Sequence, residues 1–228
     1  MSNVVIHQPE YFPWVNLFFK MLKCDKFIFL DSVQYSRRSF QNRNILGKDG
    51  IFFYITVPIK YASRDTLIRD IKIDNSKKWI NDHIKNFHYC YKKTKFFKSV
   101  ITLIETEYHK YYQYLNELNQ GLIKALARKM EIKCDFFSSA ELKAVGQKSE
   151  LILDLCEKTN ALKYITGFGS KSYLDEEKFK KKKIEINYLK LENFIYFQEN
   201  SKKRFIKDLS ILDYLFNLGF DELKKIQT

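Results

Sequence analysis

The chain has 228 residues, 45% of them hydrophobic, and a formal net charge of +13. This composition excludes a largely disordered chain. The apolar runs are too short to cross a bilayer, and no signal segment opens the sequence. We therefore expect a cytoplasmic protein without a membrane span. The positive charge either favours anionic partners or reflects only a solvated lysine surface, and both interpretations stay open.

The first third of the chain has the pattern of a β-α-β unit followed by polar loops and short strands. We expect strands over residues 3–6 and 26–30, separated by a helix over 14–23. Pro9 and Pro13 stiffen the loop before that helix. A polar loop over 32–44 and a turn at Gly47 and Gly50 lead to two more expected strands, over 51–58 and 67–73.

The middle of the chain has helical periodicity. Asn75 or Ser76 is expected to cap a helix that runs through Trp79, His83 and Phe87. Two further helices are expected over about 96–112 and 115–132.

Strands and helices alternate again in the last part. The expected elements are a strand over 135–137, a helix around 151–156, a strand over 163–166, a loop over 167–172, a helix over 175–183, a strand over 184–189 and a helix over 209–217 that Gly219 closes. The sequence therefore predicts one α/β domain over residues 1–228, with a Rossmann-like, mainly parallel sheet and a predominantly helical subdomain at about 75–132.

Two titratable residues lie where the first two predicted strands end. His7 is a candidate general base toward an amine or hydroxyl, because the unperturbed pKa of histidine is close to neutral. The alternative is that His7 bonds the backbone and shapes the loop. Asp31 stands where an acid can bind a ribose hydroxyl, a metal or a substrate amine, or else it forms an Asx turn.

Three loops carry groups that suit an anionic ligand. Arg37, Arg38 and Arg43, with the amides around them, form the richest cluster of forked donors in the chain, and such donors suit phosphate or carboxylate. The loop from Gly167 to Ser172 could cradle a phosphate with its amides or be an ordinary turn. A third loop either lines a pocket or packs internally through Tyr196, Gln198 and Phe205.

No metal site is expected. His83 and His88 are five residues apart, which is poor spacing for two ligands on one helix. The four cysteines are too scattered for a zinc ribbon or a disulfide framework.

Several segments in chain order together resemble the WbqC-like protein family. They are HQPEYFPWVNLFFK from His7, KFIFLDSVQYSRRSFQNRN from Lys26, ITVPI from Ile55, WINDH from Trp79, the serines Ser138 and Ser139, YITGFGSKSYLD from Tyr164, FQ at Phe197 and LSILDYLFNLG from Leu209. Asn16 stands where this family usually has a glycine. The resemblance implies a role in bacterial O-antigen or other surface-glycan synthesis, with transfer of an acyl or glycine-type aminoacyl group to an amino sugar.

The leading hypothesis is therefore a transferase that acts on a nucleotide-linked amino sugar. His7 accepts a proton from the attacking amine, Asp31 orients that amine, and the arginines hold phosphates, all in one shared cleft. The substrate-binding candidates are Gln8, Tyr11, Trp14, Gln34, Arg37, Arg38, Arg43, Asn44, His83, Gly167, Gly169 and Gln198. The sequence specifies no cofactor, and acyl-CoA or an activated amino acid would serve as the donor.

Two other functions stay open. One is an ATP-dependent ligase or nucleotidyltransferase, although the paired histidines of adenylyl-transferring enzymes are absent here. The other is a non-enzymatic basic protein that binds nucleic acid or an acidic polymer. No recognised motif for binding RNA or DNA occurs, so we do not expect a nucleic-acid partner. A homo-oligomer is compatible with the sequence.

Overall fold

The computed structural model describes residues 2–190, 195–201 and 204–225. The chain divides into two compact units. The first, here the sheet unit, comprises Met1–Gln8, Asn16–Val33 and Ile132–Phe194. The second, the helical unit, comprises Pro9–Val15, Gln34–Glu131 and Ile195–Thr228.

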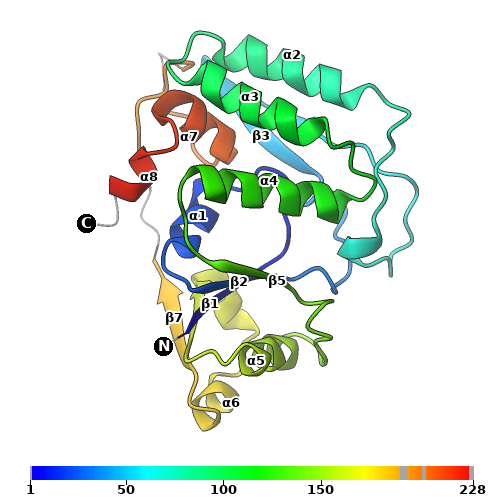
Figure 1. Cartoon of the computed structure of the whole chain (residues 1–228), viewed down its shortest axis with the longest axis vertical. Helices are drawn as coiled ribbons and strands as arrows, with labels where there is room; N and C mark the ends of the chain where they lie inside the picture. The colour runs from blue at the N-terminus through cyan, green and yellow to red at the C-terminus, as the bar shows by residue number, and fades with distance from the viewer. Residues whose placement is uncertain (1, 191–194, 202–203, 226–228) are drawn as a thin grey trace. The chain divides into compact units, whose positions relative to one another are not determined.

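The sheet unit is built on a five-stranded parallel sheet (Figure 1). Its strands are β1 (Asn3–His7), β2 (Lys26–Phe29), β5 (Asp135–Ser138), β6 (Lys163–Gly167) and β7 (Glu185–Leu189), in the spatial order β5-β2-β1-β6-β7. This confirms the predicted α/β class with a mainly parallel sheet. This spatial order of the strands is that of a doubly wound sheet. It is consistent with a Rossmann-like arrangement, and the Rossmann-like assignment stays a prediction.

The strand register brings the carboxyl ends of the strands to one edge of the sheet. His7 pairs with Phe29, Phe29 pairs with Ser138, and Gly167 lies at the end of β6 beside Leu189. The polar residues that follow β1, β2, β5 and β6 therefore start from the same edge. The strand order reverses between β1 and β6, which is where doubly wound sheets bind ligands.

Alternating strand residues bury one face of this sheet against helices. Val4, Ile6 and Ile28 share an apolar cluster with buried side chains of α5 (Ser149–Lys158) and with Phe179 of α6 (Glu176–Lys181). Helix α1 (Val15–Met21) follows the loop after β1 and buries Leu17, Phe18 and Met21.

The helical unit contains a hairpin and a group of helices. The hairpin pairs β3 (Arg43–Lys48) with β4 (Ile51–Thr56) in antiparallel register. The helices are α2 (Trp79–Tyr91), α3 (Phe97–Tyr108), α4 (Leu115–Lys129), α7 (Ile211–Leu218) and α8 (Glu222–Lys225). The ring of Phe216 in α7 stacks on Tyr91 of α2 and on Phe97 of α3. The predicted helices of the middle segment and of residues 209–217 are confirmed, whereas α8 was not predicted.

Three local predictions are wrong. Arg43 and Asn44 begin strand β3 rather than end a loop, and the turn lies at Asp49 and Gly50, both with positive φ. Residues 67–73 form a 3₁₀ helix (Ile68–Asp70) and isolated bridges rather than a strand, because their alternating burial has no continuous ladder partner. Helix α2 begins after Lys78 without a side-chain cap, since the Asn75 amide is bonded to the Tyr112 carbonyl and to the Trp79 indole.

The loop after β6 also has regular structure, because Phe168–Ser172 forms a second 3₁₀ helix. None of the helices that the structure describes is long and apolar enough to span a membrane.

Candidate functional site

His7 is the last residue of β1, and its surroundings fix both its tautomer and its charge. Its Nδ1 lies 2.8 Å from the Gln8 carbonyl oxygen, which can only accept, so Nδ1 carries the proton and Nε2 keeps a lone pair. Burial and the charge of Lys20 lower the pKa of His7 to about 3, although the bond to Gln8 acts in the opposite direction. The expectation of an unperturbed pKa is therefore wrong. The neutral imidazole can accept a hydrogen bond, but it holds a proton only weakly.

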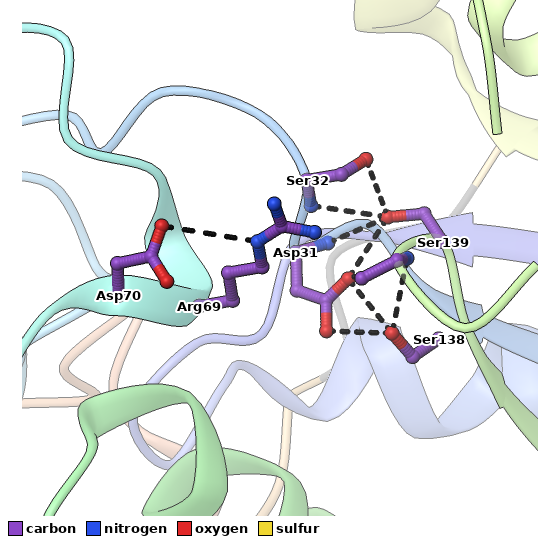
Figure 2. A network of polar contacts seen from close by, with 7 residues as sticks. Asp31, Ser32, Arg69, Asp70, Ser138 and Ser139 are labelled. Atoms are coloured by element: carbon purple, nitrogen blue, oxygen red, sulfur yellow. Dashed lines mark hydrogen bonds and ion pairs between the residues drawn. The ribbon is translucent and has the colours of Figure 1, made fainter. Parts of the chain in front are cut away.

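Asp31 follows β2 and is buried in a network of hydroxyl donors. Figure 2 shows its carboxylate between Ser138, the last residue of the neighbouring strand β5, and Ser139, which follows it. Ser138 Oγ lies 2.7 Å and Ser139 Oγ 2.9 Å from carboxylate oxygens, and the backbone N–H of Ala140 donates at 3.1 Å. A buried carboxylate is costly unless it is hydrogen-bonded, and these donors satisfy it. The Arg69–Asp70 ion pair that the figure also draws belongs to the helical unit.

The same network fixes the backbone where β2 ends. The N–H groups of Asp31 and Ser32 both donate to Ser139 Oγ, at 3.0 and 3.1 Å. Asp31 therefore joins the carboxyl ends of two adjacent strands, a structural role different from the Asx turn that the sequence offered, and its part in binding a substrate stays a prediction. Sequence reasoning did not connect Asp31 with the two serines, because more than 100 residues separate them in the chain and only strand pairing brings them together.

The glycine loop after β6 is tied mainly to itself. Ser170 Oγ donates to the Gly167 carbonyl at 2.8 Å, and Thr166 Oγ1 donates to Ser170 Oγ at 3.0 Å. A Cβ atom at Gly167 or Gly169 would meet no heavy atom within 4 Å, so open space adjoins both glycines. The structure therefore leaves room for a ligand here, and a phosphate role for this loop stays a prediction.

All three predicted anion-binding arginines line one cavity in the helical unit, with a volume of about 410 Å³. We call it the arginine cavity. Its lining residues are Tyr35, Arg37, Arg38, Asn42, Arg43, Thr56, Ile59, Lys60, Tyr61 and Ala62. Four of these carry a positive charge and none carries a carboxylate. Sequence reasoning missed Lys60, Tyr61 and Tyr35 as lining residues.

Two arginines of this cavity are held in place by the backbone. Arg37 donates to the Ala62 carbonyl at 2.7 Å, and Arg43 donates to the Arg38 carbonyl and lies 4.3 Å from the centre of the Tyr54 ring. The Nε of Arg43 is buried and has no hydrogen-bond partner in the described part of the chain. Such an unsatisfied donor is uncommon in proteins, and it belongs to a side chain that lines the cavity.

Three other candidates are buried and shape the loop after β1. Tyr11 donates its hydroxyl to Nδ1 of His83 at 2.8 Å, while Nε2 of His83 donates to the Thr56 carbonyl. Burial lowers the pKa of His83 to about 4. The Asn44 amide donates to the carbonyls of Tyr11 and Phe12, and Phe12 has a positive φ of 44° that this support maintains. We leave Tyr11, Asn44 and His83 out of the proposed site, because these contacts are internal to the helical unit.

Three further candidates are not among the residues that line the arginine cavity. Gln198 is buried, and its amide donates to Asp213 at 2.8 Å and to the Ile206 carbonyl at 2.9 Å. Trp14 packs edge-on against Phe40. Gln34 is exposed and donates to Asp65 at 3.1 Å.

No group of three or more His, Cys, Asp or Glu side chains that could hold a metal lies together in the described ranges.

The fold and the arginine cavity define an α/β protein with a strongly cationic cavity. Comparison with known proteins identifies the family to which it belongs. Residues 8–225 match the WbqC-like protein family, and the chain belongs to this family. It is 28% identical over 221 residues to a Mycobacterium tuberculosis protein named "Uncharacterized protein Rv1507c", covering 96% of this chain and 95% of that protein. No solved structure matches the chain significantly.

Proposed function

We propose that the protein is a transferase of bacterial surface-glycan synthesis that moves an acyl or aminoacyl group onto the amine of a nucleotide-linked sugar. The arginine cavity is the observation that carries this proposal. Four cations surround one space of about 410 Å³ without a compensating carboxylate among the lining residues. A diphosphate neutralises such a cluster, and guanidinium groups bind phosphate oxygens in pairs.

The family supports the substrate class, because the resemblance implies surface-glycan genes and amino sugars. Tyr35 and Tyr61 add aromatic rings to the cavity lining. Tyr61 is 93% exposed, so its ring is open to stack on a sugar or a nucleobase. A nucleotide-linked sugar combines a diphosphate with both kinds of ring.

The proposed chemistry uses the carboxyl edge of the sheet. The sugar amine attacks the carbonyl carbon of an acyl thioester, the C–N bond forms, the C–S bond breaks, and the amine proton leaves with the sulfur as a thiol. His7 Nε2 accepts a hydrogen bond from the amine and orients it, since a pKa of about 3 makes it a weak base. The convergence of His7, Asp31 and the arginines on one cleft stays a prediction, because they belong to different units.

A thermal-shift screen against sugar nucleotides, acyl-CoAs, ATP and amino acids tests the proposed class. We expect uridine-diphosphate sugars to raise the melting temperature and acyl-CoA to raise it independently. Stabilisation by ATP with release of pyrophosphate would replace the proposal with a ligase. Stabilisation by DNA alone, with a steep loss of affinity on adding salt, would replace it with a polyanion-binding protein.

A further inference from the structure

A second cavity, with a volume of about 700 Å³, lies in the helical unit beside the start of α2 and the end of α3. We call it the lysine cavity. Its volume falls in the range of about 300–1,000 Å³ that small-molecule sites occupy. It shares no lining residue with the arginine cavity. Part of its lining is Trp79, Ile80 and Asn81, from the WINDH segment, which the proposed function leaves without a role.

The lining carries an excess of positive charge. Lys77, Lys78 and Lys85 face one carboxylate among the lining residues, that of Glu105. Lys85 is 3.9 Å from Asp82 in an exposed pair, which contributes little. Lys77 and Lys78 make no ion pair with any residue that the structure describes. The Asp74 carboxylate attracts Lys77 without forming an ion pair with it, so both adjacent ammonium groups are able to contact an anion.

Aromatic rings form the apolar part of the same cavity. Trp79 and Tyr108 are both nearly buried and meet edge-on, with ring centres 5.3 Å apart. The Trp79 indole donates to Asn75 at 3.2 Å, which fixes its orientation. Tyr111 is 57% exposed, so its ring presents a free face. Such surfaces bind planar rings through stacking and edge contacts.

We propose that the lysine cavity binds a phosphate ester that carries a planar ring, the chemistry of a nucleoside diphosphate. The ammonium groups of Lys77 and Lys78 hold the phosphates as point charges, and the ring packs against Tyr111. This site does not depend on the proposed function, because no residue of the arginine cavity contributes to it.

The indole N–H resonance of Trp79 provides a local test, since the chain has two tryptophans and Trp79→Phe assigns the signal. We expect ADP to shift this resonance saturably, and inorganic pyrophosphate or adenosine to do so at least about tenfold more weakly. Lys77→Gln with Lys78→Gln should weaken ADP at least about tenfold, because the variant loses both charged contacts to the phosphates. Tyr111→Asn, which suits the positive φ at this position, should weaken ADP as well.

Two matched variants complete the test. Lys180→Gln with Lys181→Gln removes the same charge from exposed positions of α6 and should leave ADP affinity unchanged. Arg38→Gln with Lys60→Gln, in the arginine cavity, should leave the Trp79 shift unchanged. The proposal is overturned if ADP leaves the Trp79 resonance in place, or if the Lys77 and Lys78 double variant binds ADP as the wild type does. Equal affinity for pyrophosphate and ADP would overturn the role of the ring.

Discussion

The imidazole of His7 keeps one protonation state across the physiological pH range. Burial and the charge of Lys20 lower its pKa to about 3, so the ring is neutral with its lone pair on Nε2. A neutral imidazole with such a low pKa can orient an amine through a hydrogen bond, but it is a weak base toward the proton of that amine. The structure thus changes the role that we assign to this residue while keeping its position at the end of β1.

The lowered pKa of His7 makes a prediction about stability. The unfolded chain binds a proton on this ring below pH 6.5, whereas the folded chain does so only near pH 3. The unfolded state therefore binds more protons between these values, and the free energy of unfolding falls as the pH falls through this window. In His7→Gln this contribution is absent, so urea denaturation should show a smaller loss of stability from about pH 7 to about pH 4.

His83 acts in the same direction in both proteins, so its contribution cancels in the comparison. Identical pH dependence of wild type and His7→Gln would contradict a lowered pKa of His7 in the folded chain.

Two glycines with positive φ differ in what an added Cβ atom would contact. Gly219 has a φ of +80°, and a Cβ atom there would lie 2.8 Å from the Phe96 ring. Gly50, in the hairpin turn between β3 and β4, has a φ of +84° and no heavy atom within 4 Å of such a Cβ. Both alanine variants incur the cost of a positive φ, and the ψ of −167° at Gly219 places that backbone in a region that essentially only glycine adopts, at a cost of about 1–3 kcal/mol. Gly219→Ala adds overpacking, about 1–3 kcal/mol.

Denaturant unfolding of the two variants measures this difference directly. We expect Gly219→Ala to lose more stability than Gly50→Ala, because it adds overpacking against Phe96 to the greater backbone cost at Gly219. Equal losses would contradict both the backbone conformation and the close approach of Phe96 at Gly219.

Elements with strong apolar runs and clear boundaries could be predicted from the sequence. Strands β1, β2 and β6 and helix α7 are short apolar or amphipathic segments with glycine, proline or a polar loop at an end, and each lies where expected. Strand β3 could not be recognised, because Arg43, Asn44 and Gly47 give it the composition of a loop. Its strand character comes from pairing with β4, a contact that local composition does not encode.

Some contacts of the candidate site could likewise be predicted from the sequence, and others could not. Arg37, Arg38 and Arg43 are close in sequence, so their presence in one cavity could be expected. Lys60 enters that cavity from a distant loop, and Ser139 reaches Asp31 only through the pairing of β2 with β5. Both contacts depend on tertiary structure, which a single sequence does not reveal.

At the level of the whole molecule, the chain passes repeatedly between the two units. The loop Pro9–Val15 belongs to the helical unit, although β1 before it and most of α1 after it belong to the sheet unit. Within the helical unit, Asn119 donates to the Pro9 carbonyl, and Ser210 and Asn44 donate to the Phe12 carbonyl. The loop Pro9–Val15 is thus a connection whose backbone carbonyls are held by polar side chains of the helical unit.

The arginine cavity gathers four of the chain's positive charges, which contribute to its net charge of +13, at one place. A solvated lysine surface would bind anions weakly at many places, whereas the proposed function requires four cations around one cavity to bind one diphosphate at a defined place. Arg38 and Lys60 are the best positions for a test, because both side chains are exposed and no hydrogen bond or ion pair within the described chain would be lost with them.

Isothermal titration of uridine diphosphate into three proteins tests this central claim most directly. The proteins are the wild type, Arg38→Gln with Lys60→Gln, and the charge-matched control Lys180→Gln with Lys181→Gln. We predict that one uridine diphosphate site of the wild type becomes at least about tenfold weaker in the arginine-cavity variant, that binding in the lysine cavity is retained there, and that the control binds as the wild type does. Equal affinity in all three proteins, or equal weakening in both variants, would contradict a diphosphate site in the arginine cavity.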